Sequence, residues 1–270
     1  VRGMYIKYYK GNEDIEGLMQ SLKSTVVQKE GFQSILNSKS HNKVKEIINM
    51  MDSKLAQLPL AAKEDQLALY NVALHFIAEA AEGSRSTNAA ESVLVKMERT
   101  DLIPDRMSYS NVMKAWTKIG TFPAIAQAEE HLMTFLDLNL EAANFEGVDR
   151  MHPSRRLNAN CFNVVMNAYS KLNTSDGDDR VRQLYALMIS ASQTLPFLAP
   201  DMNSLRTFFE SSPADVADTL LHDLVVQAES SEIKVPIVLF ASALNKWANS
   251  GRNDAGERAE KVLRLQEKYS

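Results

Sequence analysis

Few residues of this sequence suit metal or nucleophilic chemistry, and their spacing fits no such motif. The five histidines form no His-x-x-x-His pair, and the single cysteine, Cys161, stands at no zinc-ligand spacing from them. Structural zinc sites need several Cys and His ligands at short spacing, so we expect no metal and no cofactor. One cysteine also excludes an internal disulfide, and we expect Cys161 to be a packed thiol. The histidines are His41, His75, His131, His152 and His222.

Two stretches resemble ligand loops only in part. "GRNDAGER" (251–258) has two glycines but lacks the Lys-Ser/Thr that completes a phosphate loop. "TSDGDD" (174–179) lacks the alternating oxygen ligands of an EF-hand, so we interpret it as a loop between helices. Neither a Gly-x-Ser-x-Gly elbow nor the His-x-Glu and Cys-x-x-Cys of a deaminase occurs. The sequence therefore predicts a protein that is not an enzyme.

The composition favours helices. Of 270 residues 45% are apolar and 24% charged, with only 10 Gly and 8 Pro, and Ala, Leu, Met, Glu and Lys are frequent. We expect an all-α chain. The longest apolar stretch, 235–244, is about half of the roughly 20 residues that a membrane span needs. The 30 basic and 34 acidic residues give a net charge of −4, which disfavours nonspecific binding of nucleic acid.

The N-terminal residues indicate a truncated beginning. The sequence starts at Val1, so we expect the natural N-terminus and any targeting peptide to lie upstream. Residues 1–28 carry Glu13, Asp14 and Glu16, whereas transit peptides avoid acidic residues. We interpret 1–28 as a helical extension or the remnant of a preceding repeat.

A helical stripe recurs along the rest of the chain. A leading aromatic or Leu is followed by apolar residues three, four and, in most copies, seven places later, which is one face of a helix. The leading residues are separated by 38, 39, 53, 43 and 35 residues and are Phe32, Tyr70, Tyr109, Phe162, Leu205 and Phe240. A second stripe follows each of them, as in Ala90, Val93, Leu94 and Met97 or in Ala259, Val262, Leu263 and Gln266.

The alternation predicts six helical hairpins, because one hairpin cannot bury both of its faces and must stack on others. Asn88 three before Glu91 fits a helix start, as do Asp254 before Glu257 and Ser212 before Pro213. We predict a right-handed α-solenoid superhelix with insertions, the largest at 139–158. Its units are 29–66, 67–105, 106–158, 159–201, 202–236 and 237–270. The alternative is that such a stripe is common to any core helix.

Several stretches resemble pentatricopeptide repeats. Tyr70-Asn71 and Phe162-Asn163 open the first helices, "VRQLYALM" is typical of the second helix, and Pro104-Asp105 and Pro200-Asp201 close their units. The units that begin near 67, 106, 159 and 237 match well, and those at 29 and 202 weakly. The Trp-Leu-Gly signature of tetratricopeptide repeats, the nearest competitor, is absent.

The resemblance implies that single-stranded RNA is bound at one base per repeat. In that family the residue after the leading aromatic and the last residue of the unit read the base. Matched residue by residue, the base-recognition pairs are Asn71 with Asp105, Ser110 with Asn158, and Asn163 with Asp201, which suggests U-A-U. The competing interpretation is that Asp105, Asn158 and Asp201 only cap the following helix. Gln33, Arg206, Ala241 and Pro236 occupy the equivalent places elsewhere and carry no code.

The same comparison suggests contacts to the RNA backbone and to base faces. Lys118 and Lys171 each lie eight residues beyond a base-recognition residue and would meet phosphates, although plain solvated lysines are the alternative. Met107 and Val238 would stack on bases. Residues 150–156 ("RMHPSRR") form a further small basic cluster. We expect the stripe aromatics Tyr109, Trp116, Phe162, Tyr169 and Trp247 to be core residues rather than base platforms.

Two functions remain open at this point. The first is an RNA-binding adaptor of a mitochondrion or plastid that acts by occupancy in transcript processing, stability or translation, alone or with protein partners in a ribonucleoprotein. The second is a protein-interaction scaffold, for example a subunit of an organelle ribosome, which the acidic balance favours. Neither involves a membrane or a small-molecule substrate.

Overall fold

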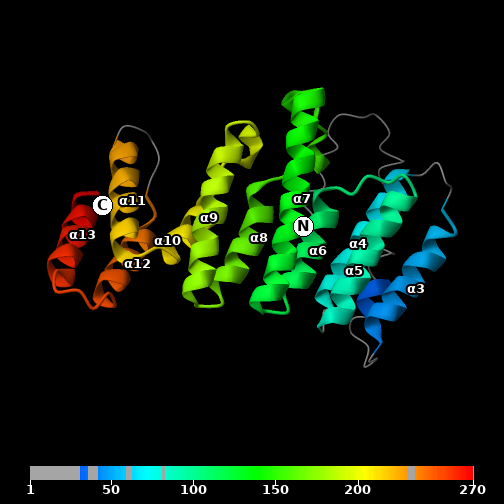
Figure 1. The fold of residues 1–270 in the computed structure, drawn as a ribbon, viewed down its shortest axis with the longest axis horizontal. Coiled ribbons are helices and arrows are strands. Elements are labelled where there is room, and N and C mark those ends of the chain that lie inside the picture. Colours follow the sequence, from blue (N-terminus) through cyan, green and yellow to red (C-terminus); the bar gives the residue numbers. More distant parts are fainter. Residues whose placement is uncertain (1–30, 36–41, 59–62, 81–82, 230–234, 270) are drawn as a thin grey trace. The chain divides into compact units, whose positions relative to one another are not determined.

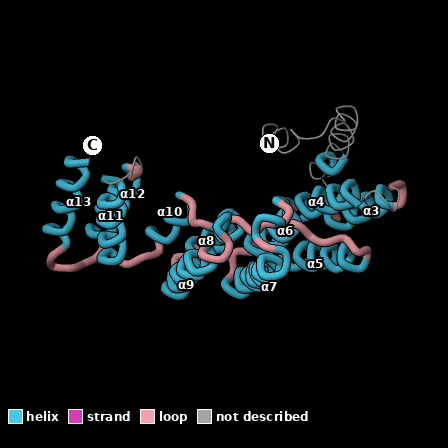
Figure 2. Tube along the Cα trace, turned by 90° about the horizontal axis from the view of Figure 1, so that it is seen from above, coloured by secondary structure: helices cyan, strands magenta, loops and turns pink. Residues whose placement is uncertain are grey.

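The computed structural model describes residues 31–35, 42–58, 63–80, 83–229 and 235–269 (Figure 1). The described residues form helices joined by loops, with no β-strand among them (Figure 2). The predicted all-α class is therefore confirmed. The predicted extension at 1–28 lies outside the described residues. Helices divide between two compact units, residues 1–119 (unit 1) and 120–270 (unit 2).

Unit 1 alternates helices that begin with an aromatic stripe (first helices) and helices that follow them (second helices). After the helical residues 31–35 come α3 (Lys43–Leu55), α4 (Lys63–Glu79), α5 (Ser84–Arg99) and α6 (Arg106–Thr117). The first helices α4 and α6 pack on each other, and α4 also packs on α3 and α5. Their shared core contains Phe32, Ile47, Tyr70, Leu74, Val93, Met97 and Val112.

Unit 2 continues the alternation. Its helices are α7 (Phe122–Glu146), α8 (Ala159–Ser170), α9 (Ser175–Ser192), α10 (Met202–Glu210), α11 (Ala214–Glu229), α12 (Ile237–Ala248) and α13 (Ala255–Tyr269). Short 3-10 turns lie at η1 (Val148–Arg150), η2 (Pro153–Arg155) and η3 (Pro196–Leu198). The first helices α8, α10 and α12 pack in sequence, and each also contacts the second helix that follows it. This arrangement is repeat-like, whereas the right-handed superhelix of the whole array stays a prediction.

The stripes predict the core well. All five leading aromatics are at most 4% exposed, and Leu205 is 8% exposed. The first helices α6, α8, α10 and α12 begin at the first residues of their predicted units, while α4 begins at Lys63, earlier than predicted. One stripe residue is wrong: Leu263 is 46% exposed, because α13 packs mainly against α12 and buries Val262 instead.

Three predicted helix boundaries are wrong. Asn88 lies inside α5, which begins at Ser84 because Gly83, with φ of +79°, turns the chain one turn earlier. The predicted loop 174–179 is the start of α9: Thr174 Oγ1 accepts a hydrogen bond of 3.2 Å from Gly177 N. The insertion predicted at 139–158 begins as helix, since α7 continues to Glu146.

Candidate functional site

The first predicted pair, Asn71 and Asp105, is brought together in unit 1. Asn71 Nδ2 donates a hydrogen bond of 3.0 Å to Asp105 Oδ1. Both residues are buried, with 5% and 6% of their surface exposed. Asp105 Oδ1 also accepts from Met107 N at 2.9 Å and Ser108 N at 3.0 Å, so it caps α6. Pairing and capping therefore occur in the same carboxylate.

Ser108 closes this pair. Its Oγ lies 2.7 Å from Asn71 Oδ1 and 3.1 Å from Asp105 Oδ1. A hydroxyl has one hydrogen to donate, and the shorter distance is to Asn71. Asn111 Nδ2 donates to the backbone oxygen of Asn71 at 3.3 Å. Both ends of the Asn71 amide thus have protein partners.

The third predicted pair, Asn163 and Asp201, repeats the contact in unit 2. Asn163 Nδ2 donates to Asp201 Oδ1 at 2.9 Å, and Asp201 caps α10 by accepting from Ser204 N at 2.9 Å. Here the surroundings are more open. Asp201 is exposed, and Ser204 Oγ donates to Asp201 at 2.9 Å. Asn163 is only 4% exposed, yet its Oδ1 has no hydrogen-bond partner among the described residues.

The electrostatics of Asp201 follow from these contacts. Burial of its carboxyl favours the neutral acid, but the hydrogen bonds from Ser204 and Asn163 outweigh burial and hold its pKa below its ordinary value. Asp201 is therefore an ionised acceptor at neutral pH.

The second predicted pair is divided between the two units. Ser110 is 8% exposed in α6 of unit 1. Asn158, half-buried, stands before α8 in unit 2, and its Oδ1 accepts a hydrogen bond of 3.6 Å from Cys161 Sγ. Cys161 is fully buried, as predicted for a packed thiol. The joint recognition of one base by Ser110 and Asn158 stays a prediction.

The two predicted phosphate contacts lie at the opposite helix ends from the base-recognition pairs. Lys118 follows α6, and its Nζ donates to the backbone oxygens of Glu79 at 2.6 Å and Ala78 at 3.3 Å. These carbonyls end α4, whose C-terminus attracts a cation. Lys171 follows α8 and is exposed. Both lysines are exposed, but the observed contacts also give Lys118 a structural role.

The predicted stacking residues are accessible. Met107 is 44% exposed in the first turn of α6, and Val238 is 47% exposed in the first turn of α12. The stripe aromatics behave as predicted for core residues: Tyr109, Phe162, Tyr169 and Trp247 are buried, and Trp116 is partly buried with its Nε1 donating to Glu91 at 3.0 Å.

The basic stretch 150–156 is partly structural. Arg156 donates to the backbone oxygens of Met151 at 3.0 Å and Asp149 at 3.2 Å, and its guanidinium lies 5.5 Å from the centre of the Phe197 ring. Arg150 and Arg155 are exposed.

Sequence reasoning missed an ion pair in unit 2 between the buried Glu129 and the partly exposed Arg180. Tyr169 Oη donates to Glu129 Oε2 at 2.8 Å, and the Arg180 guanidinium contacts both oxygens of the same carboxylate. Burial and the bond to Glu129 raise the pKa of Tyr169 well above its ordinary value. Glu129 comes from α7, Tyr169 from α8 and Arg180 from α9, so the cluster ties three helices together. Its members lie 40 and 51 residues from Glu129, and no local pattern signals them.

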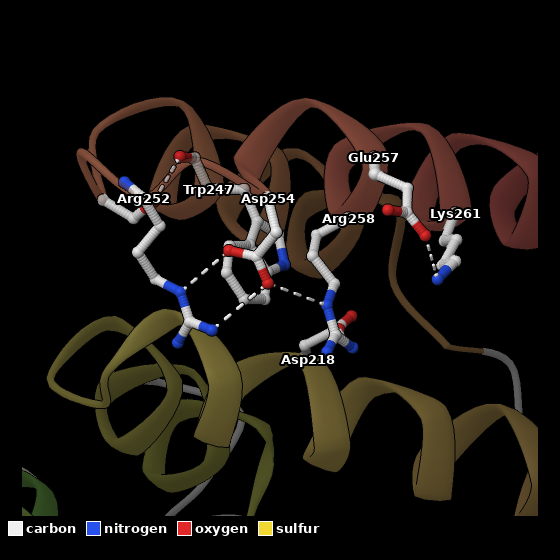
Figure 3. Close-up of polar contacts among 8 residues, drawn as sticks. Asp218, Trp247, Arg252, Asp254, Glu257, Arg258 and Lys261 are labelled. Carbon is white, nitrogen blue, oxygen red and sulfur yellow. Dashed lines mark hydrogen bonds and ion pairs between the residues drawn. The ribbon is translucent and has the colours of Figure 1, made fainter.

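The stretch 251–258 forms a charged cover over Trp247. Arg252 donates to both Asp254 oxygens at 2.9 and 3.2 Å, and Arg258 approaches the same carboxylate at 3.5 Å (Figure 3). Their guanidinium carbons lie 5.4 and 5.8 Å from the Trp247 ring centre. Arg258 also lies 3.9 Å from Asp218 of α11. The arrangement joins α11, α12 and α13 around a buried ring.

A neighbouring surface pocket of 510 Å³ contains two cations that are already engaged. Lys246 Nζ donates to the backbone oxygens of Ser212 at 2.6 Å and Glu210 at 2.7 Å, and burial lowers its pKa. Arg252 is held by Asp254. The pocket therefore presents no unpaired positive charge from these two residues.

In the part of the chain that the structure describes, no group of three or more His, Cys, Asp and Glu side chains is arranged to hold a metal ion. No described helix is both long and apolar enough to cross a bilayer. Comparison with models of known protein families and with curated protein sequences finds no match to this chain.

Proposed function

We propose that this protein binds single-stranded RNA, at one base per repeat, through pairs made of a polar residue in one first helix and the polar residue that precedes the next first helix. It would act by occupancy, as a non-enzymatic adaptor in transcript processing, stability or translation within a mitochondrion or plastid. The resemblance to pentatricopeptide repeats suggests this activity and this location.

The recurrence of one polar geometry supports the proposal most directly. Asn71 and Asp105 in unit 1 and Asn163 and Asp201 in unit 2 make the same Nδ2 to Oδ1 bond, at 3.0 and 2.9 Å. Short amide and carboxylate groups supply the donors and acceptors that a base edge needs. Met107 and Val238, exposed in first turns, offer apolar surface for stacking.

The charge of the chain limits the form of this binding. A net charge of −4 gives little general attraction to phosphates, so affinity depends on local contacts and falls with salt. Both predicted phosphate contacts, Lys118 and Lys171, are exposed, and Lys118 already donates to backbone oxygens of α4.

A binding assay with matched variants tests the proposal. The protein is mixed with a randomised RNA pool at low salt, and retained RNA is measured for the wild type and for Asn163→Ala with Lys171→Ala. We expect the double variant to lose affinity by about tenfold or more. The control is Asn144→Ala with Lys114→Ala, which changes the same residue types at exposed positions elsewhere. No retention of RNA by the wild type would reject the proposal.

A scaffold for proteins is the second candidate, and one observation favours it. Phe145 is 89% exposed at the end of α7, which suits a protein contact. A scaffold would be indifferent to the Asn163 and Lys171 substitutions.

A further inference from the structure

Helix α7 is longer than the other second helices of both units and carries a braced extension. It has 25 residues, against 16 in α5, 18 in α9, 16 in α11 and 15 in α13 (Figure 1). Asn139 fixes the chain that returns from it: its Oδ1 accepts from Leu157 N at 2.8 Å, and its Nδ2 donates to Phe135 O at 2.9 Å. Asn139 is 2% exposed. The extension is therefore an anchored part of unit 2.

One side of α7 combines exposed apolar and acidic residues. Leu138 is 46% and Phe145 is 89% exposed, and their separation of seven positions places both on the same side of the helix. Glu130, Asp137 and Glu141 are also exposed and project from the same side by helical spacing. We call these five residues the acidic face of α7. It lies opposite the buried side, which contains Ala128, Leu132 and Asn139.

The charge of this face is not neutralised within the described part of the chain. Helix α7 contains five acidic residues and no lysine or arginine. Glu129 contacts Arg180, whereas no ion pair of the described residues involves Glu130, Asp137, Glu141 or Glu146. Glu141 and Glu146 also lie toward the C-terminal end of the helix, where the helix dipole repels negative charge. A cation that approached this face would relieve both effects.

Helix α13 gives the contrasting case. Its Leu263 is as exposed as Leu138, at 46%. There, however, Glu257 is paired with Lys261 at 2.7 Å and Glu260 with Arg264 at 2.6 Å. Exposed leucine and glutamate thus occur on both helices, but the α13 carboxylates of Glu257 and Glu260 are paired, whereas those beside Leu138 form no ion pair among the described residues.

We propose that the acidic face of α7 docks a cationic amphipathic helix of a partner protein. Lysines or arginines of that helix would lie against Glu130, Asp137 and Glu141, while its apolar side would cover Leu138 and Phe145. RNA carries the wrong sign of charge for this face. Two copies of the face would bring like charges together in an isologous dimer. This proposal does not depend on RNA binding.

The test uses a synthetic helical peptide with lysines on one side and leucines on the other. Its affinity for the full chain is measured by fluorescence anisotropy, beside a peptide of the same composition in shuffled order. We expect the amphipathic peptide to bind more tightly, and higher salt to weaken it. Two variants of the protein are compared with the wild type: the double variant Asp137→Asn with Glu141→Gln, and the single variant Phe145→Ser. Each should weaken binding of the amphipathic peptide by about tenfold.

The control variant changes the same chemistry on α13: Glu257→Gln, Glu260→Gln and Leu263→Ser. We expect this variant to bind the peptide as the wild type does. Equal weakening by the α7 and α13 variants, or equal binding of the two peptides, would overturn the proposal. The proposal also fails if the wild type self-associates in sedimentation and Phe145→Ser does not, because the face would then bind a second copy of the chain. It fails as well if Phe145→Ser abolishes RNA binding, because the face would then bind RNA. All the substituted side chains are exposed, so circular dichroism should show an unchanged fold. If one variant is misfolded, the peptide affinity of the single variant Glu141→Gln is measured instead, and an affinity equal to that of the wild type would overturn the proposal.

Discussion

Two asparagine–aspartate pairs, one in each unit, share a bond but differ in their surroundings. In unit 1 the Asn71 amide is enclosed, because Asp105 takes its donor and Ser108 fills its acceptor. In unit 2 Asn163 makes the same donation to Asp201, but its buried Oδ1 has no partner among the described residues. A buried acceptor without a donor is costly. The same residue types can therefore be fully hydrogen-bonded in one place and leave a buried acceptor without a partner among the described residues in another.

The largest difference should appear when the aspartates are removed. Asp105→Ala deletes the cap of α6 and leaves the Asn71 amide buried without its acceptor, which should cost about 3 kcal/mol. Asp201→Ala also removes a cap and the acceptor of Asn163, but at a more exposed carboxylate, so it should cost less, about 2 kcal/mol. Because the two units need not unfold together, hydrogen exchange of the α6 and α10 amides is the suitable measurement. An equal loss of protection against hydrogen exchange in α6 and α10 would contradict the proposed difference between the two pairs.

The asparagines should differ in RNA binding if the proposed function holds. Asn163→Ala should weaken binding to an RNA selected from the pool by about tenfold, whereas Asn71→Ala, whose amide is already hydrogen-bonded at both ends, should weaken binding less and reduce stability more. Affinities are compared by anisotropy at a temperature where both variants are folded. The distinction between the pairs is refuted if Asn71→Ala costs as much affinity as Asn163→Ala.

Ser108 should account for the closure of the unit 1 pair. Ser108→Ala removes the donor to Asn71 Oδ1 and should lower stability by about 1 kcal/mol. A double-mutant cycle with Asn71→Ala should show coupling of similar size. The cycle between Ser204 and Asn163 should show little, since Ser204 donates to Asp201 instead. Similar coupling energies in both cycles would show that Ser108 is not the cause of the difference between the two asparagine–aspartate pairs.

The smallest effect is the titration of Asp201. Hydrogen bonds from Ser204 and Asn163 lower its pKa in the folded state, so its stabilising contribution is present above the unfolded pKa and is lost as pH falls through the folded pKa. The start of α10 should therefore loosen only below about pH 4. Carboxyl-carbon NMR should show the pKa of Asp201 below its ordinary value and rising in Asn163→Ala. No rise in that variant would mean that the Asn163 bond is absent.

The apolar stripes predicted the helices and most of the core because burial selects residues at helical spacing. The proximity of Asn71 to Asp105 and of Asn163 to Asp201 followed from the spacing of the repeats. Their difference did not, because both aspartates stand three residues before a serine, Ser108 and Ser204, and the sequence motif is identical. The two pairs differ in the bond that the serine hydroxyl makes and in the exposure of the aspartate, which is buried at Asp105 and exposed at Asp201.

Other features depend on contacts that local sequence does not encode. Lys118 bonds carbonyls at the end of α4, about 40 residues earlier, so its spacing from Ser110 gave no indication of that role. The acidic stretch 174–179 was predicted as a loop because Asp-Gly favours turns. In the structure Thr174 caps the helix and Asp176 and Asp178 stabilise its first turn.

Tyr169 fixes α8 at two points. A Cβ at Gly177 would lie 2.7 Å from the Tyr169 carbonyl oxygen, so the start of α9 can approach this closely only with glycine there. At its other end the Tyr169 hydroxyl is bonded to Glu129 of α7. Any rotation of α8 about its axis would disturb both contacts, and Asn163 lies earlier on this same helix. The amide of Asn163 is thus held in one orientation by its helix, and because its Oδ1 is buried, a ligand could reach that atom only if a neighbouring side chain moved.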